Sequence, residues 1–465
     1  MGTIGSSRNQ GKAAPIKFDE TSGKIPGRNI VGIVPVPKVS IMNVNQGEGE
    51  SQVPSKWLTL RDVQALDERA ALGRPMMALR QEALTRFLSL PFPATNHELW
   101  RHTKTDLFDW EGLRNSSVVD FKLGLTESGS ASAASTETLT SALPEGVTLS
   151  VDFSAYASQL GELFGERALD LVENSPAQML LAAASAGCVV HVAKGRKIKE
   201  PLLLSQVVKA ASTSAAPLIV VLVEPNASVT IVEDIELGAW AGLYAPRVEV
   251  VIQANASMEF VSIQRLSNAA TYLGRHRFHL LRDASVRSIH VALGAKTARL
   301  DLDCKLYEPG GQADMFSLYL GAGGRHVDFH PTQWHLAPHC RSNLYCKGAL
   351  KDVSRSVYFG YIRVAEAAQK TDAYQTNRNL LLSPDARADA IPNLEIKAND
   401  VKCSHGASIG QVGAEELFYL MSRGLPRAAS EKLLVEGFFA DLMGKISSQF
   451  ARDVVDRVVM EQLYA

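Results

Sequence analysis

Three short turns in the middle of the chain decide the fold, and they occur at nearly equal spacing. They are Pro225-Asn226-Ala227-Ser228, Ala254-Asn255-Ala256-Ser257 and Arg282-Asp283-Ala284-Ser285. The central Asn or Asp recurs after 29 and then 28 residues, and a fourth turn, Glu308-Pro309-Gly310-Gly311, follows about 27 residues later. Each turn precedes a run that is typical of a strand: VTIVEDI, MEFVSIQ, VRSIHVAL and ADMFSLYL.

A turn and a strand repeated at a fixed period indicate stacked units, because one such unit is too small to bury its own apolar face. We therefore predict a β-solenoid, that is a parallel β-helix, over residues 187–411. A β-sandwich or barrel is the alternative, since turns of the Asn-Ala-Ser type are common. Those folds would less naturally keep one turn chemistry at one period.

The segments on either side of this core are predicted to be helical. Apolar residues recur at helical spacing over 55–90, again at about 155–185, and after Gly413 to the end of the chain. A stretch rich in Ser, Ala, Thr and Gly at 124–148 predicts a low-complexity loop. The predicted fold class is thus mixed α and β, with a flexible extension over 1–54, a helical domain over 55–186, the β-helix over 187–411 and a helical domain over 412–465.

Composition excludes several classes of protein. The 465 residues carry 48 Lys and Arg against 49 Asp and Glu, a net charge of -1, which argues against nucleic acid as a partner. Five cysteines are too few for a disulfide scaffold and favour a reducing compartment. Since no secretory signal or membrane-spanning run is recognisable, we expect a cytoplasmic protein, with a plastid location not excluded.

One group of candidate metal ligands is concentrated between residues 326 and 346. Imidazole and thiolate groups bind zinc or iron, and His335 and His339 would lie on one side of a strand. However, Pro338 lies between these two, and no C-x2-C pair supports a closed zinc site. The alternative is that these are ordinary strand and loop residues; the set is His326, His330, His335, His339, Cys340 and Cys346.

A second candidate is the segment Lys402-Cys403-Ser404-His405-Gly406. On an extended strand, Cys403 and His405 point to the same side. A thiolate beside an imidazole could be a nucleophile with its base, or half of a metal or cluster site completed by another chain. No Asn or Asp that would orient the imidazole can be identified, so a papain-like hydrolase is poorly supported.

Common nucleotide and hydrolase motifs are missing from the sequence. The fragment Gly294-Ala295-Lys296-Thr297 lacks the glycines of a phosphate-binding P-loop, and 321–324 (GAGG) fails the G-x-G-x-x-G spacing. There is no G-x-S-x-G nucleophile elbow. If ATP is involved in the function, another subunit hydrolyses it.

Several linked motifs in the second half of the chain resemble one known family. The motifs are QKTDAYQTNRNLLLS at 369–383, PNLEI at 392–396, DVKCSHGA at 400–407, LFYL at 417–420 and SRG at 422–424. Together they resemble the SufB/SufD family of iron–sulfur cluster assembly proteins, and the CSHGA element resembles the SufD branch more than the SufB branch. Upstream, 100–103 (WRHT) is similar to the family's W-R-Y-T segment, with His102 where Tyr is usual. The resemblance is dense over 320–445, looser over 80–320 and absent over 1–54.

The resemblance implies a right-handed parallel β-helix between helical domains and a scaffold subunit without catalytic activity. Such a subunit pairs with SufB through the β-helix and binds the SufC ATPase through its C-terminal helices, here with Phe418, Leu433, Phe438 and Leu442 as candidate contacts. The nascent Fe–S cluster, or its iron, would be shared with SufB, with sulfur supplied indirectly by desulfurase proteins. The resemblance places His405 at that shared site, with a weaker case for Cys403, and admits a reduced flavin in the complex.

Two other functions stay open at this point. The chain could be a purely structural partner that shapes the complex while SufB supplies every ligand. It could also be a self-contained enzyme that uses Cys403 and His405, which would require turnover of a small ester or peptide by the isolated chain.

Overall fold

The computed structural model describes residues 57–70, 73–94, 96–125, 143–159, 175–208 and 214–464. The extension predicted over 1–54 and most of the low-complexity loop predicted over 124–148 lie outside the described residues, as does part of the helical stretch predicted at 155–185. Among the described helices, none is long and apolar enough to cross a membrane.

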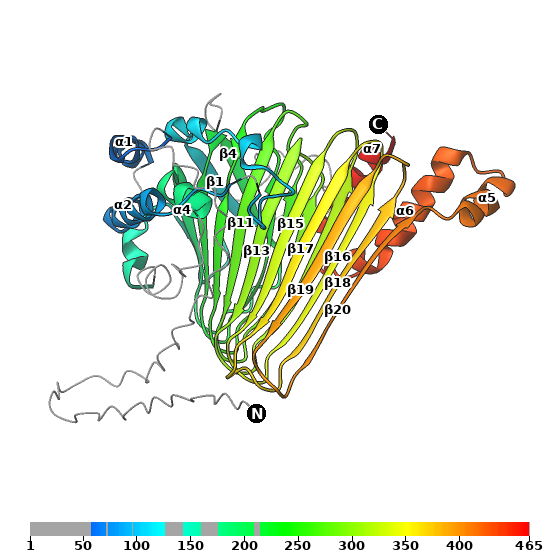
Figure 1. The fold of residues 1–465 in the computed structure, drawn as a ribbon. Helices are drawn as coiled ribbons and strands as arrows, with labels where there is room; N and C mark the ends of the chain where they lie inside the picture. The colour runs from blue at the N-terminus through cyan, green and yellow to red at the C-terminus, as the bar shows by residue number, and fades with distance from the viewer. Residues whose placement is uncertain are drawn as a thin grey trace, which may run out of the picture. The chain divides into compact units, whose positions relative to one another are not determined.

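Two stacked sheets form the core, and the chain alternates between them along a parallel β-solenoid, as predicted (Figure 1). Sheet 1 runs in the order β1 (Val119–Leu125), β4 (Leu202–Val208), β7 (Ser228–Ile235), β10 (Ser257–Gln264), β12 (Ser285–Ala292), β14 (Gln312–Gly321), β16 (Arg341–Leu350), β18 (Asp372–Leu381) and β20 (Lys402–Gln411). Sheet 2 runs in the order β2 (Val147–Ser150), β3 (Ala186–Val192), β6 (Pro217–Val223), β9 (Arg247–Ile252), β11 (Thr271–Leu280), β13 (Thr297–Leu306), β15 (His326–His335), β17 (Arg355–Val364) and β19 (Arg387–Ile396). The short strands β5 (Ser214–Ala215) and β8 (Leu243–Tyr244) pair beside sheet 2.

Antiparallel pairs begin both sheets. Strand β1 pairs antiparallel with β4, and β2 pairs antiparallel with β3, whereas the pairs that follow are parallel. The N-terminal segment predicted to be helical therefore also contributes two strands. They lie on either side of the segment between β1 and β2, most of which is outside the described residues. Strand β1 has the alternating pattern VDFKLGL that is typical of a strand, whereas β2 is too short to show one.

The turns quoted above have the backbone geometry that the stacking requires. Asn226, Asn255 and Asp283 have φ of 61°, 59° and 53°, the left-handed region that Asn and Asp adopt more readily than most residues. The backbone N–H of each donates to a carbonyl of the following turn of the solenoid, at 2.9 to 3.0 Å. This hydrogen bond joins each repeat of the solenoid to the next one. The residues that recur in the sequence are therefore the residues that connect successive repeats.

The same turn continues further than its sequence signature does. His339 and Lys370 also have positive φ, 60° and 61°, and their N–H groups donate to Gln369 O and Asp400 O. The next residue in each case, Cys340 or Thr371, is buried, as Ala is in the earlier turns. Register pairs the first residues of successive strands in sheet 1, 27 to 31 residues apart along the chain: Ser228, Ser257, Ser285, Gln312, Arg341, Asp372 and Lys402.

Helices cover parts of both sheets. On the N-terminal side these are α1 (Leu60–Ala70), α2 (Arg74–Ser89), α4 (Ser175–Ala182) and the short 3-10 helices η1 (Thr105–Leu107), η2 (Glu111–Asn115) and η3 (Ser154–Tyr156). Their apolar side chains form one buried cluster with strands of sheet 2, with Trp100, Trp110 and Met179 packed with Val220 and Leu222.

The C-terminal helices are α5 (Ala414–Ser422), α6 (Arg427–Met443) and α7 (Gln449–Tyr464). Residues of α6 and α7, such as Phe439 and Val455, share a buried cluster with Ile289 and Phe316 on the outer side of sheet 1. Helix α5 and the start of α6 extend beyond the sheet (Figure 1).

The interior of the solenoid contains one acid in an unusual setting. Glu233 on β7 is fully buried, and its carboxylate accepts hydrogen bonds from Gln206 Nε2 and Ser262 Oγ, both at 2.7 Å. Burial raises the pKa of Glu233 from 4.5 to about 7, and the neighbouring Asp234 adds to the rise. The folded chain therefore holds this proton more tightly than the unfolded chain does.

This raised pKa predicts a loss of stability as pH rises. Below about pH 4.5, the protonated Glu233 makes its full contribution to the free energy of unfolding. This contribution, up to about 3 kcal/mol, is lost as the pH rises through 7. Replacing Glu233 by Gln should remove this dependence and make the variant more stable than the wild type at pH 8. Urea unfolding at pH 5 and pH 8 measures the difference, with the exposed Glu200→Gln as control. An unchanged pH dependence in Glu233→Gln would contradict the assignment.

Candidate functional site

The solenoid ends in two open strand edges. Strand β20 pairs with β18 and β19 pairs with β17, and no other strand of the described residues pairs with the opposite edge of either. Exposed apolar side chains line these edges, including Leu394, Ile396 and Ile409. An open edge with apolar side chains is a surface that another β-strand can extend.

Cys403 and His405 lie on the same side of β20, as their spacing predicts. Register places Cys403 beside Ala373 and His405 beside Gln375, and both of these β18 residues are buried inside the solenoid. Cys403 and His405 therefore point toward the solenoid interior, roughly 7 Å apart along the strand. Because no further turn covers them among the described residues, Cys403 is half-buried and His405 is exposed.

A fixed polar layer lies beside His405. Tyr358 Oη donates to Gln375 Oε1 at 2.8 Å, and Gln375 Nε2 donates to the carbonyl of Asn393 at 2.9 Å. Asn393 Nδ2 in turn donates to the carbonyl of Ile391 at 3.1 Å. A Cβ at Gly360 would come within 2.4 Å of Gln375 Oε1, so a side chain there would displace this layer. The strand next to His405 is thus held in one arrangement by buried and satisfied hydrogen bonds.

The Cys403 thiol is not activated in this structure. Partial burial raises its pKa, and the charge of Asp372 adds to the rise, while a backbone hydrogen bond at Ala373 opposes it. Its side chain packs beside the small buried cluster that includes Val364 and Ala373. A protonated, half-buried thiol is a poor nucleophile, so the geometry disfavours a self-contained enzyme that uses Cys403.

The other predicted ligands are distributed over different parts of the solenoid. His326 Nε2 and Thr103 Oγ1 lie 2.6 Å apart, and His330 Nε2 lies 2.8 Å from Asp328 Oδ1 on the outer side of sheet 2. His335 is inside the solenoid, 2.7 Å from Ser342 Oγ, and burial lowers its pKa to about 4. Each of these histidines is engaged with a different protein partner.

The remaining three candidates have structural positions. His339 and Cys340 belong to one of the turns that link successive turns of the solenoid, and Cys346 is buried inside it, where burial raises the pKa of its thiol to about 12. Within the described ranges, no three His, Cys, Asp or Glu side chains are arranged to hold a metal ion. A cluster or metal at His405 would therefore need ligands from outside the described residues.

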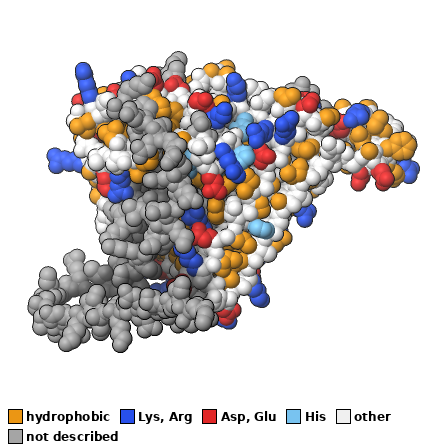
Figure 2. Space-filling model, in the orientation of Figure 1, with side chains coloured by type: hydrophobic (Ala, Val, Ile, Leu, Met, Phe, Trp, Pro, Cys, Tyr) orange, Lys and Arg blue, Asp and Glu red, His pale blue; other side chains and the backbone are white. Residues whose placement is uncertain are grey.

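The C-terminal helices separate the four predicted partner contacts into two groups. Phe418 on α5 is 74% exposed and Leu433 on α6 is also exposed, whereas Leu442 is fully buried against sheet 1 and Phe438 is partly buried. Figure 2 shows hydrophobic side chains gathered over the projecting end formed by α5 and the start of α6. The sequence analysis missed three further exposed apolar residues there, which are Tyr419, Met421 and Leu425.

An acid on α6 connects this helix to sheet 1. Asp441 accepts hydrogen bonds from Tyr345 Oη at 2.9 Å and Lys347 Nζ at 2.5 Å. Lys347 also donates to the carbonyl of Phe438, and these bonds lower the pKa of Asp441 although partial burial opposes them. Since β16 is two strands from β20 in sheet 1, α6 is joined to the sheet that carries His405.

Comparison with known proteins identifies the family. Residues 206–438 match the family model "SUF system FeS cluster assembly, SufBD core domain". The chain belongs to the SufB/SufD family. The match covers half of the chain and includes the solenoid from β4 through β20 and the start of the C-terminal helices.

Individual relatives agree with this membership. The chain is 33% identical over 231 residues to an iron–sulfur cluster assembly SufBD family protein of Mycobacterium leprae. The aligned region covers 48% of this chain and 59% of that relative. It is 27% identical to the iron–sulfur cluster assembly protein SufD of Escherichia coli over 78% of this chain and 87% of the relative. It is 26% identical to the chloroplastic protein ABCI7 of Arabidopsis thaliana over 82% and 84%. Within the family the chain is SufD-like.

The raised pKa of the Cys403 thiol predicts slow alkylation at neutral pH. Iodoacetamide should label Cys403 at pH 7 more slowly than it labels glutathione, and the rate should increase steeply toward pH 9 and above, because the thiolate is the reactive form. Mass spectrometry of the full chain measures the labelling, with Cys403→Ser as the variant that loses it and the buried Cys188→Ser as control. Rapid labelling at pH 7 would contradict this view of the site and favour the enzyme hypothesis.

Proposed function

We propose that this chain is a SufD-like scaffold subunit that supports the assembly and transfer of Fe–S clusters in a Suf complex. The observation that carries the proposal is the exposed imidazole of His405 on the terminal strand of the solenoid. The imidazole is an iron ligand, it lies at an open strand edge, and the family model that matches is one of FeS cluster assembly. The proposal assigns ATP hydrolysis to the SufC partner and no catalytic activity to this chain. It places the protein in the cytoplasm or in a plastid.

SufB is the proposed partner at the open end. A second β-helix could continue sheet 1 from β20 and sheet 2 from β19, which would satisfy the free backbone groups of both edges and bury Ile409 and Leu394. Pairing of this kind would place residues of the partner directly over the side of β20 that bears Cys403 and His405.

In this arrangement His405 would be one ligand of a shared site. A neutral imidazole next to a thiolate of SufB would bind iron of the nascent cluster, which is the cargo of the complex. Cys403 is the weaker candidate for a cluster ligand because its thiol is half-buried and has a raised pKa. Binding to a metal would nevertheless favour the thiolate form. One labile ligand from each subunit suits a cluster that has to be transferred.

SufC is the proposed partner of the exposed helical surface. Phe418 and Leu433 present apolar groups to solvent on α5 and α6, whereas Leu442 holds α6 against sheet 1. Through Asp441, Tyr345 and Lys347, a displacement of α6 by a SufC dimer would act on β16 and, through the paired strands, on the open edge. The ATPase cycle could thus open or close the shared site.

A purely structural role is the second candidate. The open edges and the helical surface would suffice to shape a complex in which SufB supplies every ligand. The engagement of His326, His330 and His335 with protein partners favours this view, because it leaves only the turn residue His339 and His405 exposed among the predicted histidines. A variant of His405 alone separates the two functions.

His405→Ala should abolish cluster accumulation and leave assembly of the complex intact, because it removes a ligand without changing the backbone edge. The measurement is the absorbance spectrum and iron content of the anaerobic complex co-purified with SufB and SufC. Ser404→Ala, on the opposite side of β20, is the matched control and should accumulate clusters normally. Full cluster accumulation in His405→Ala would leave only the structural role.

Phe418→Asp should weaken binding to SufC at least tenfold, because it places a charge in the centre of the exposed apolar surface. Pull-down and calorimetric titration with SufC measure the effect. Val353→Asp, a similarly exposed apolar residue in a loop of the solenoid, is the control and should bind normally. Equal affinity for both variants would exclude α5 from the SufC surface without affecting the assignment of His405.

A further inference from the structure

A concave area on the outer side of sheet 2 is lined mainly by charged and aromatic side chains, and we name it the arginine groove. It has room for several water-sized groups, about 100 Å³. It extends over β11, β13, β15 and β17, and its far end reaches Glu395 on the edge strand β19. It is lined by Leu99, Arg275, Arg277, Arg299, Asp301, Asp303, Lys305, His330, Thr332, Trp334, Phe359, Tyr361 and Arg363.

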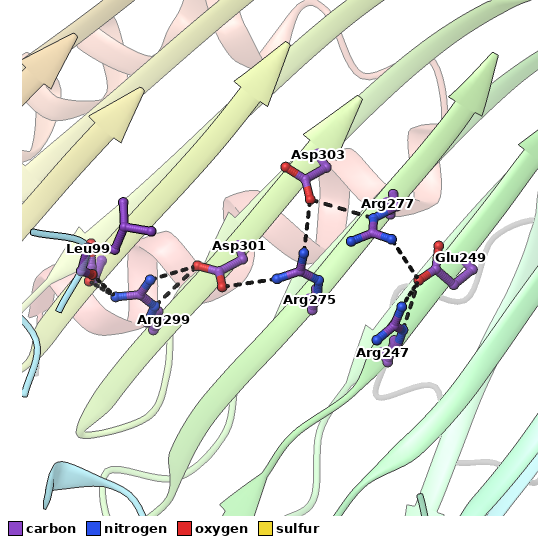
Figure 3. A network of polar contacts seen from close by, with 9 residues as sticks. Leu99, Arg247, Glu249, Arg275, Arg277, Arg299, Asp301 and Asp303 are labelled. Carbon is purple, nitrogen blue, oxygen red and sulfur yellow. Dashed lines mark hydrogen bonds and ion pairs between the residues drawn. The ribbon is translucent and has the colours of Figure 1, made fainter. Parts of the chain in front are cut away.

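Cations outnumber acids among the residues that line this groove. Five side chains are Arg or Lys and two are Asp. Figure 3 shows how the arginines are held: Arg275 lies between Asp301 and Asp303, and Arg299 contacts Asp301 and donates to the carbonyl of Leu99. The guanidinium groups are thus fixed in position before any ligand arrives, which lowers the entropic cost of binding one.

Two further acids lie behind the lining. Glu249 contacts Arg247 and Arg277, and Asp328 contacts Arg299, and both carboxylates are fully buried. Burial alone would raise the pKa of both acids, but Arg247 and Arg277 hold the pKa of Glu249 well below its usual range, and His330 and then Arg299 do the same for Asp328. Both acids are therefore ionised, and they orient Arg277 and Arg299 from the protein side while they offset part of the positive charge of the groove.

The far end of the groove is rich in donors. Lys305, only 2% exposed, places its ammonium 5.5 Å from the centre of the Trp334 ring, and Arg363 stacks 4.6 Å from the centres of both Trp334 and Tyr361. The Trp334 indole N–H is buried without a hydrogen-bond acceptor. Arg363 Nε is 3.5 Å from Glu395 at the rim, which is an ion-pair contact and not a close hydrogen bond. The Trp334 N–H and Arg363 Nε are therefore buried donors without a hydrogen-bond acceptor, and an acceptor that binds from outside would satisfy them.

We propose that the arginine groove binds a small anion that carries phosphate groups. Arginine and lysine side chains recognise phosphate oxygens through charge-assisted hydrogen bonds, and an oxygen of such a ligand would accept the Trp334 N–H. The low exposure of Lys305 and Arg277 strengthens these interactions because less water competes for the ligand. The site is separate from His405 and does not depend on cluster assembly.

Isothermal titration of the full chain with inorganic pyrophosphate tests the proposal. We expect one binding site, with an affinity that falls as the salt concentration rises. Lys305→Gln and Arg363→Gln should each weaken binding at least tenfold. The exposed Arg341→Gln on sheet 1 is the control for a lost surface charge and should bind as the wild type does.

Trp334→Phe covers the case in which Lys305→Gln fails to fold, because it keeps an aromatic ring while it removes the N–H together with the second ring of the indole. It should also weaken binding of pyrophosphate, by several fold, in a protein whose thermal unfolding is close to that of the wild type. Absence of pyrophosphate binding to the wild-type chain, or wild-type affinity in folded Arg363→Gln and Trp334→Phe, would overturn the proposal. Binding of a polyglutamate peptide without binding of pyrophosphate would overturn it as well and identify a surface for acidic peptides.

Discussion

The backbone hydrogen bonds between successive turns of the solenoid are the constraint on which the rest of the structure depends. Each parallel strand is satisfied by the strands of the turns before and after it, and the left-handed turn residues repeat the same link at the corners. A solenoid built this way has no intrinsic end, so its last turn must present unsatisfied edges. The first end finishes in the antiparallel strands β1 and β2, whereas the other end finishes in the parallel strands β19 and β20. The location of the candidate site follows directly from this asymmetry.

Side chains inside the solenoid change character toward that open end. The earlier turns contain branched apolar residues such as Val221, Val250 and Leu302, together with the buried polar group of Glu233. The last turns instead contain Gln375, Asn377 and Asn379, whose amides are hydrogen-bonded to one another and to Tyr319 and Tyr358. Buried amides cost free energy unless they are paired, so this layer contributes little net stability and instead fixes one geometry. Next to His405, the ligand that we propose, such a fixed geometry would matter more than additional apolar burial.

The sequence predicted the solenoid because its early turns share a chemistry, Asn or Asp followed by Ala and Ser, that the left-handed backbone favours. It did not reveal that His339 and Lys370 occupy the same corner position, since their side chains do not show that preference. His339 and Cys340 therefore looked like metal ligands although they form a turn. The side-by-side placement of Cys403 and His405 could be predicted because it depends on only two residues of one strand. The polar layer beside them could not, because it depends on strands about thirty residues apart.

The connection between the C-terminal helices and the open end rests on the same ladder of strands. Asp441 joins α6 to Tyr345 and Lys347 on β16, and every residue of β16 pairs in register with β18, as every residue of β18 does with β20. Parallel strands paired over ten residues slide past one another only by breaking many hydrogen bonds at once. In the function that we propose, force applied to α6 would move these three strands together and reach His405 as a shift of the whole edge. Movement of a helical partner would in this way be coupled to the geometry of the proposed shared site.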